Sequence, residues 1–155
     1  AMGAYVAITS SSDEKLEKAK ALGADFIVNY KAEPEWGSAV NAWSGEKGVD
    51  HVVEVGGPAT LAQSINACRV NGNIVLIGVL TGVKGDVPTA ALMAKQINLK
   101  GIIVGSREHQ NDFVNALEAS GIKPVIDTSF SLDELAKAFE YEVNGKHFGK
   151  ICIDI

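Results

Sequence analysis

The chain alternates short apolar runs with segments whose apolar residues recur at helical spacing. Most of the runs are continuous and β-branched, which is typical of strands that are covered on both faces of a parallel sheet. Amphipathic segments separate them, and this alternation is the signature of βαβ units. We therefore expect an α/β fold with strands at Tyr5 to Thr9, Phe26 to Asn29, His51 to Val55, Asn73 to Val79 and Leu99 to Val104.

Local signals bound the helices between these strands. Ser11 and Glu14 have the spacing of a capping box, so the first helix is expected to begin at Ser11. Trp36 and Trp43 recur at helical spacing in the second helix, which predicts that both face the core. The third helix is expected to begin at Pro58 and to continue towards Gly72. A fourth is expected over residues 111 to 120.

The end of the chain has a different pattern. Ser131 and Glu134 have the spacing of a second capping box, and Gly145 follows the helix that they open. After it, apolar and polar residues alternate from Lys150 to Ile155, as in a strand with one wetter face. We expect an antiparallel or edge strand there.

Composition narrows the function classes. A net charge of -5 and scattered Lys and Arg residues disfavour a nucleic-acid partner. Cys68 and Cys152 have no metal-ligand spacing, so we read both as buried thiols and expect no metal to be bound by this chain. No apolar run reaches the roughly 20 residues of a membrane helix, and no leader opens the chain. We expect no membrane partner and a cytoplasmic location.

Glycines stand at the predicted ends of several strands. Gly56 and Gly57 follow one strand, Gly78 begins the segment after the next, and Gly105 follows the last. Ligands bind beyond the carboxyl ends of strands in an open parallel sheet, and glycine lets a flat ligand approach the backbone. Each glycine alone is explained by a tight turn, but together they favour a ligand cleft.

The loop after the first strand indicates which kind of ligand the cleft binds. An acidic residue at this position would accept hydrogen bonds from a ribose and repel a 2′-phosphate, but the chain has Ser10 there. Hydroxyls of Ser10 and Ser11, a helix N-terminus and Lys15 can instead hold a phosphate dianion. This chemistry favours NADP over NAD. A plain serine cap is the alternative, and the two roles are compatible.

No catalytic group stands out. The histidines are isolated from one another, and no Ser-His-Asp set, paired carboxylates or Walker loop is found. We assign no catalytic residue to this chain.

These residues resemble the medium-chain dehydrogenase/reductase family, which contains the zinc-type alcohol dehydrogenases and quinone oxidoreductase-like enzymes. The matching stretches are SSSDEKLEKAKALGADFIVNY at 10–30, GVDHVVEVGG at 48–57, GNIVLIGVLTG at 72–82 and SLDELAKAFEYEVNGKHFGKICIDI at 131–155. They cover almost the whole chain in the family's order. The resemblance implies a Rossmann-type doubly wound parallel sheet with a C-terminal helix and returning strand.

The resemblance also implies roles for individual residues. Ser10 takes the place of the aspartate of NAD-using members, Lys15 matches a residue at the adenine ribose, and Tyr30 lies beside the adenine. On the same basis the nicotinamide faces Gly78, Val79 and Leu80, its carboxamide lies near Val104, Gly105 and Ser106, and Lys150 approaches the phosphates. Gly56 belongs to the same cofactor groove.

Two expected parts of the family pattern are missing. The GxGxxG loop and its strand should precede residue 1, and the domain that carries any catalytic zinc is absent. Residues 1–122 are then an incomplete dinucleotide-binding domain, and 123–155 belong to the family's catalytic domain. The missing strand is central in the usual strand order. We expect the gap to close by pairing of the two flanking strands, or to be filled by a strand from another molecule.

The resemblance therefore predicts a fragment of an oxidoreductase that transfers hydride between NADP(H) and a carbonyl, alcohol, quinone or enone. The alternative is a nucleotide-binding module without catalysis, and the fragment alone is expected to be inactive. A methyltransferase on a similar sheet is disfavoured, since it would use an acidic ribose contact. A homodimer through Leu99 to Val104, or by strand exchange, is the expected assembly.

Overall fold

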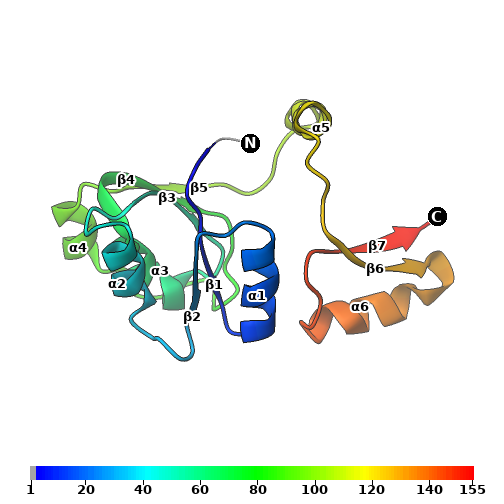
Figure 1. The fold of residues 1–155 in the computed structure, drawn as a ribbon, viewed down its shortest axis with the longest axis horizontal. Coiled ribbons are helices and arrows are strands. Elements are labelled where there is room, and N and C mark those ends of the chain that lie inside the picture. Colours follow the sequence, from blue (N-terminus) through cyan, green and yellow to red (C-terminus); the bar gives the residue numbers. More distant parts are fainter. Residues whose placement is uncertain (1–2) are drawn as a thin grey trace. The chain divides into compact units, whose positions relative to one another are not determined.

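The computed structural model describes residues 3–155 and confirms the expected alternation of strands and helices (Figure 1). All paired strands are parallel. In chain order the elements are β1 (Ala7–Ser10), α1 (Asp13–Ala21), β2 (Phe26–Asn29), α2 (Trp36–Trp43), β3 (Val49–Glu54), α3 (Pro58–Ala67), β4 (Cys68–Leu76), α4 (Thr89–Ala94), β5 (Asn98–Gly101), α5 (Arg107–Ser120), β6 (Ile126–Ser131), a 3-10 turn (Leu132–Glu134), α6 (Leu135–Val143) and β7 (Lys150–Asp154).

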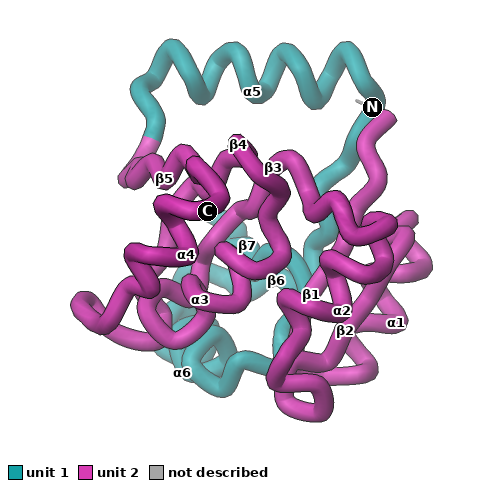
Figure 2. The backbone as a smooth tube through the Cα atoms, turned by 90° about the vertical axis from the view of Figure 1, so that its left-hand side faces the viewer, with its two compact units in different colours: residues 1, 105–155 teal, residues 2–104 magenta. Residues whose placement is uncertain are grey.

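The chain forms two compact units, and it passes from one to the other between Val104 and Gly105 (Figure 2). The unit that comes first along the chain, magenta in Figure 2, contains the strands and helices from β1 to β5, and we call it the first unit. The second contains α5, β6, α6 and β7. The boundary after residue 122 that the sequence resemblance implied stays a prediction.

Two separate parallel sheets make up the first unit. β1 pairs with β2, with Thr9 opposite Val28, and β4 lies between β3 and β5. Each strand leads into a helix that returns the chain to the next strand, which is the βαβ arrangement that the pattern predicted. The Rossmann-like α/β class is therefore confirmed.

The expected direct pairing of β1 with β3 is wrong. Within residues 3–155 these two strands belong to different sheets and share no ladder. β3 consequently keeps an open edge, where Val53 of the strand is 67% exposed and Val55, just after it, is 48% exposed. Such apolar edges normally invite another strand. The second alternative, a strand from another molecule, stays a prediction.

Helix α2 joins the two sheets through a shared apolar cluster. Trp36 and Val40 on α2 pack with Val28 of β2 and Ala67 of α3, and all of these are buried. Trp43 stacks on Phe26, with ring centroids 5.3 Å apart. The prediction that both tryptophans face the core is confirmed. A second cluster, made by Leu61, Ile65, Cys68 and Ile74, holds α3 against the β3-β4-β5 sheet.

Several element boundaries differ from the expected ones. Helix α1 is capped by Ser12 rather than Ser11, because the Ser12 hydroxyl accepts the amide of Lys15 at 3.4 Å. Helix α3 ends at Ala67, well before Gly72. Lys95 makes this early end possible, since its Nζ donates to the carbonyl oxygens of Ile65, Asn66 and Cys68.

The strands β4 and β5 also end earlier than expected. β4 stops at Leu76 because the next two amides, of Ile77 and Gly78, both turn back to the carbonyl of Glu54. β5 ends at Gly101, which lies opposite Leu76 in the ladder. Residues 102–104 therefore lie outside the strand in which they were expected.

In the second unit, β6 and β7 form a parallel pair and α6 packs against both. The expected edge position of the last strand is confirmed, but an antiparallel partner is wrong. Ser131 and Glu134 do not form a capping box: the Ser131 hydroxyl bonds the Glu134 carboxylate at 3.3 Å, and the helix begins only at Leu135. Tyr141 on α6 donates to Asp127 on β6 at 2.7 Å.

Candidate functional site

The turn after β1 brings three predicted residues to the start of α1. The Ser10 hydroxyl accepts the amide of Ser12 at 3.2 Å, so the turn occupies residues 10–12 before the helix begins. Ser11 is exposed at the tip of this turn, and Lys15 follows in the first helical turn. A helix N-terminus with hydroxyls beside it favours an anionic group. Asp13 and Glu14 in the same helical turn carry negative charges, which disfavour an anionic group there.

Tyr30 lies next to this turn at the end of β2. Its amide donates to the carbonyl oxygen of Ser10 at 3.1 Å, and its side chain is 39% exposed. Asn29 extends the contact, because its side-chain amide donates to the Asp13 carboxylate at 2.7 Å. The sequence did not single out Asn29, which ties the end of β2 to the start of α1.

The turns after β3 and β4 lie in contact, as the glycines at these strand ends suggested. A Cβ atom on Gly78 would collide with the carbonyl oxygen of Val55, so these backbones approach more closely than a side chain allows. Gly57, the N-cap of α3, has φ 93°, which favours glycine, and a Cβ atom there would lie 3.1 Å from the Cα of Val79.

Thr81 fastens these two turns together. Its amide and its hydroxyl both donate to the carbonyl oxygen of Gly56, at 2.8 and 2.9 Å. The same hydroxyl accepts the amide of Ala59 in the first turn of α3, at 3.0 Å. Between Gly78 and Thr81, the side chains of Val79 and Leu80 are 51% and 84% exposed. An apolar surface is thus presented beside the glycine turns.

A buried carboxylate at the end of β3 was missed by the sequence reasoning. Glu54 is 3% exposed, and its Oε1 atom accepts the amides of Gly56 and Gly57 at 2.7 and 3.0 Å. Oε1 also accepts the Thr60 hydroxyl at 2.6 Å, and Oε2 accepts the hydroxyl of Ser64. One signal was available: an acidic residue interrupts the apolar run VVEVGG directly before paired glycines.

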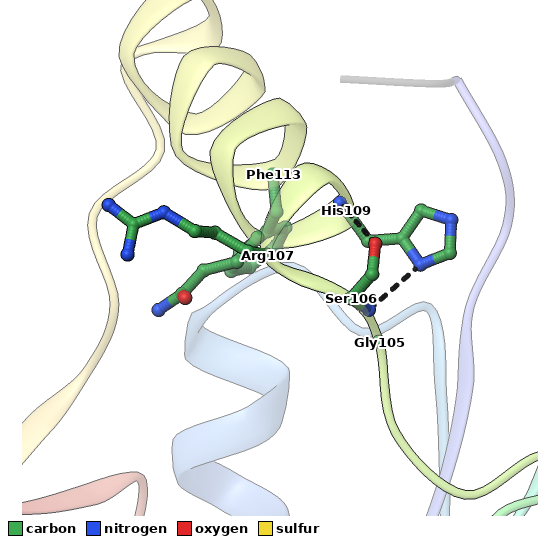
Figure 3. Close-up of a pocket in the computed structure, with 6 residues that line it drawn as sticks. Gly105, Ser106, Arg107, His109 and Phe113 are labelled. Atoms are coloured by element: carbon green, nitrogen blue, oxygen red, sulfur yellow. Dashed lines mark hydrogen bonds between the residues drawn. The ribbon is translucent and has the colours of Figure 1, made fainter.

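Gly105 and Ser106 belong to the second unit, where they begin α5 (Figure 3). The Ser106 hydroxyl accepts the amide of His109, and the Ser106 amide donates to Nδ1 of His109, both at 3.2 Å. His109 is therefore a capping residue rather than a loop residue. With Arg107, Gln110 and Phe113 these residues line a shallow hollow of about 480 Å³.

The remaining predicted residues stand apart. Val104 closes the first unit and is 87% exposed. Lys150 begins β7 in the second unit, where its amide bonds the carbonyl oxygen of Val125 at 2.8 Å. The structure thus brings together Ser10, Ser11, Lys15 and Tyr30, and separately Gly56, Gly78, Val79 and Leu80, with both groups in the first unit.

Chemically, this arrangement suits binding rather than catalysis. The first group offers hydroxyls, an ammonium and amides, and the second offers close backbone and apolar side chains. No three His, Cys, Asp or Glu side chains within residues 3–155 gather into a set that could hold a metal ion. The same part of the chain has no helix long and apolar enough to cross a membrane.

Known proteins share this sequence and this fold. The sequence model described as zinc-binding dehydrogenase matches residues 1–121. A zinc-type alcohol dehydrogenase-like protein of Schizosaccharomyces pombe is 42% identical over an alignment of 160 positions, which covers 100% of this chain and 46% of that protein. An alcohol dehydrogenase of Geobacillus stearothermophilus is 28% identical, over 100% of this chain and 44% of its own length. The chain spans about half the length of such curated relatives.

Solved structures agree. A putative alcohol dehydrogenase from Sinorhizobium meliloti has a TM-score of 0.90 at 40% identity, covering 99% of this chain and 44% of that one. A structure named NAD-dependent alcohol dehydrogenase has a TM-score of 0.89 at 31% identity, with 99% and 44% covered. The chain therefore belongs to the zinc-binding dehydrogenase family, within the medium-chain dehydrogenases and reductases that its sequence resembles.

Proposed function

We propose that this chain forms the nicotinamide-dinucleotide-binding part of an oxidoreductase. The complete enzyme transfers hydride between NADP(H) and a carbonyl, alcohol, quinone or enone substrate. The observation that carries the proposal is the fastening of the turns after β3 and β4 through Thr81, which leaves glycine backbone and apolar side chains beside each other. A flat ring such as that of nicotinamide can lie against such a surface. Relatives named alcohol dehydrogenase and quinone oxidoreductase support the reaction class.

We propose NADP(H) as the cofactor because of the turn after β1. Ser10 puts a hydroxyl where a carboxylate would repel a 2′-phosphate. Ser11 is exposed beside it, and Lys15 supplies a positive charge one turn into α1. Tyr30 lies against the same turn and would flank the adenine. NAD(H) is the alternative, and the name of one solved neighbour, an NAD-dependent alcohol dehydrogenase, favours it.

When bound, the nicotinamide supplies the hydride chemistry. The residues of this chain bind and orient the cofactor and exclude water from one side of it. The described residues do not fit a zinc ion, since no suitable group of ligands is present among them. We propose that the groups that act on the substrate belong to another part of the complete enzyme, and we expect this chain by itself to bind the cofactor without turnover.

The assembly that we propose uses the open edge of β5. β5 pairs only with β4 among the described strands, and the following residues Ile103 and Val104 are 88% and 87% exposed. A symmetric copy could cover this apolar segment. Exchange of a strand at the open edge of β3 is the alternative assembly. Roles for Gly105, Ser106 and Lys150 in cofactor binding, and a cytoplasmic location, stay predictions.

Titration of the purified chain with NADPH, followed by nicotinamide fluorescence, tests this function. Saturable binding that adenosine 2′,5′-bisphosphate displaces supports it, and no saturable binding contradicts it. An aldehyde or quinone is then added to the complex. We expect no consumption of NADPH, because the proposal assigns the groups that act on the substrate to another part of the enzyme, and steady consumption would refute that assignment.

A further inference from the structure

We propose that Glu54 and Thr81 are positioning residues, which hold the two glycine turns together so that the nicotinamide half of the cofactor fits against the surface that the turns form. This inference rests on the proposed function. It adds residues that act through the backbone and touch no ligand themselves. Both side chains point into the protein's own turns and bond only groups of this chain.

The burial of Glu54 needs a reason beyond the formation of a turn. A carboxylate that is 3% exposed loses its hydration, and this loss must be offset by hydrogen bonds. Four donors surround it: two amides of the turn and the hydroxyls of Thr60 and Ser64 on α3. Water could satisfy the two amides of an ordinary exposed turn. The carboxylate instead fixes both amides relative to α3.

Glu54 also organises the second turn through its backbone. Its carbonyl oxygen accepts the amides of Ile77 and Gly78, at 2.8 and 3.2 Å, where the chain leaves β4. One residue thus holds the turn after β3 with its side chain and the turn after β4 with its carbonyl. Any shift of Glu54 would move both.

Thr81 completes the connection from the other side. Its hydroxyl donates its single proton to the Gly56 carbonyl and accepts the Ala59 amide, so one atom joins the second turn to the first turn and to α3. Val79 and Leu80 lie in the loop that this bond closes. Thr81 is exposed, so its replacement removes the two bonds of the hydroxyl without opening the core, and only the bond from its backbone amide to the Gly56 carbonyl remains.

The test compares two ligands on one set of variants. NADPH spans both halves of the proposed site, whereas adenosine 2′,5′-bisphosphate carries only the adenine half. Thr81→Val keeps the size of the side chain but cannot donate or accept, while Thr81→Ser keeps the hydroxyl. For Thr81→Val we expect about tenfold weaker binding of NADPH. We expect unchanged binding of the bisphosphate, and Thr81→Ser should restore NADPH binding.

Glu54→Gln provides a second variant, in which the amide nitrogen that replaces one oxygen cannot accept. It should show the same selective loss for NADPH. If it does not fold, as judged by circular dichroism, the Thr81 pair alone decides. Equal affinity of wild type and Thr81→Val for NADPH, or an equal loss for both ligands, would overturn the inference while leaving the proposed function intact. Failure of wild type to bind NADPH would overturn the proposed function, and this inference with it.

Discussion

The ammonium group of Lys95 lies 2.9 Å from the carbonyl oxygen of Cys68, at the junction of α3 and β4. It also donates to the carbonyls of Ile65 and Asn66, so one side chain from the end of α4 bonds two carbonyls in the last turn of α3. Burial lowers the pKa of Lys95. A lysine here replaces the glycine cap that helices commonly use.

Replacing Lys95 with Met should destabilise the first unit. The stem is retained but the carbonyls lose their donor, which is expected to cost about 1 to 3 kcal/mol of unfolding free energy. Urea denaturation followed by tryptophan fluorescence measures this change, since Trp36 and Trp43 both lie in the same unit. Lys47→Met, at an exposed loop position, is the matched control. An equal effect of the two substitutions would contradict the capping role.

The open edge of β3 predicts self-association. Val53 is 67% exposed on a strand that pairs on one side only, and charge on an edge strand suppresses pairing. Val53→Lys should therefore reduce the dimer or larger species that sedimentation velocity detects at micromolar concentration. Val143→Lys is the control, because Val143 is equally apolar and 85% exposed but lies on α6. A wild-type chain that is purely monomeric would refute strand exchange.

Tyr141 should titrate at unusually high pH. The Asp127 carboxylate accepts its hydroxyl at 2.7 Å and raises the pKa of Tyr141, since ionisation would break this bond and place two negative charges together. A tyrosine pKa that is raised in the folded state stabilises the fold below the ordinary tyrosine value, and this stabilisation is lost as pH rises through the folded-state pKa. Ultraviolet phenolate absorbance measures the titration. In Asp127→Ala one tyrosine should titrate at lower pH than in wild type, and identical curves would contradict the contact.

Sequence reasoning was most accurate where local signals and burial agree. β2 was predicted without error, and α2 was found from two tryptophans that both face the core. The capping box failed at Ser11 because Ser10 bonds Ser12 and moves the start of the helix. No local sequence pattern predicts this contact between the Ser10 hydroxyl and the Ser12 amide.

Other features depend on partners distant in sequence. The end of α3 is set by Lys95, and the end of β4 by the Glu54 carbonyl. β5 ends where its partner β4 ends, because Gly101 lies opposite Leu76. The glycine turns were predicted as a ligand site from their place at strand ends. Their fastening by Thr81 and Glu54 was not, because it needs the two turns to be adjacent in space.

The role of Ser10 predicts how cofactor preference changes. In Ser10→Asp a carboxylate would face the 2′-phosphate and offer acceptors to an unphosphorylated ribose instead. We expect NADPH binding to weaken by about tenfold or more and NADH binding to strengthen. Ser120→Asp, at the exposed end of α5, is the control for added charge. An unchanged preference between NADPH and NADH in Ser10→Asp would show that this residue does not distinguish a phosphorylated ribose from an unphosphorylated one.

The central claim is that this chain binds a nicotinamide dinucleotide and prefers the phosphorylated form. Isothermal titration of the wild-type chain with NADPH and with NADH, under the same buffer and salt, tests it most directly. The account predicts saturable binding of both, with the lower Kd for NADPH. A lower Kd for NADH would contradict the assignment of the turn after β1, and heat signals that do not saturate for either ligand would contradict the site itself.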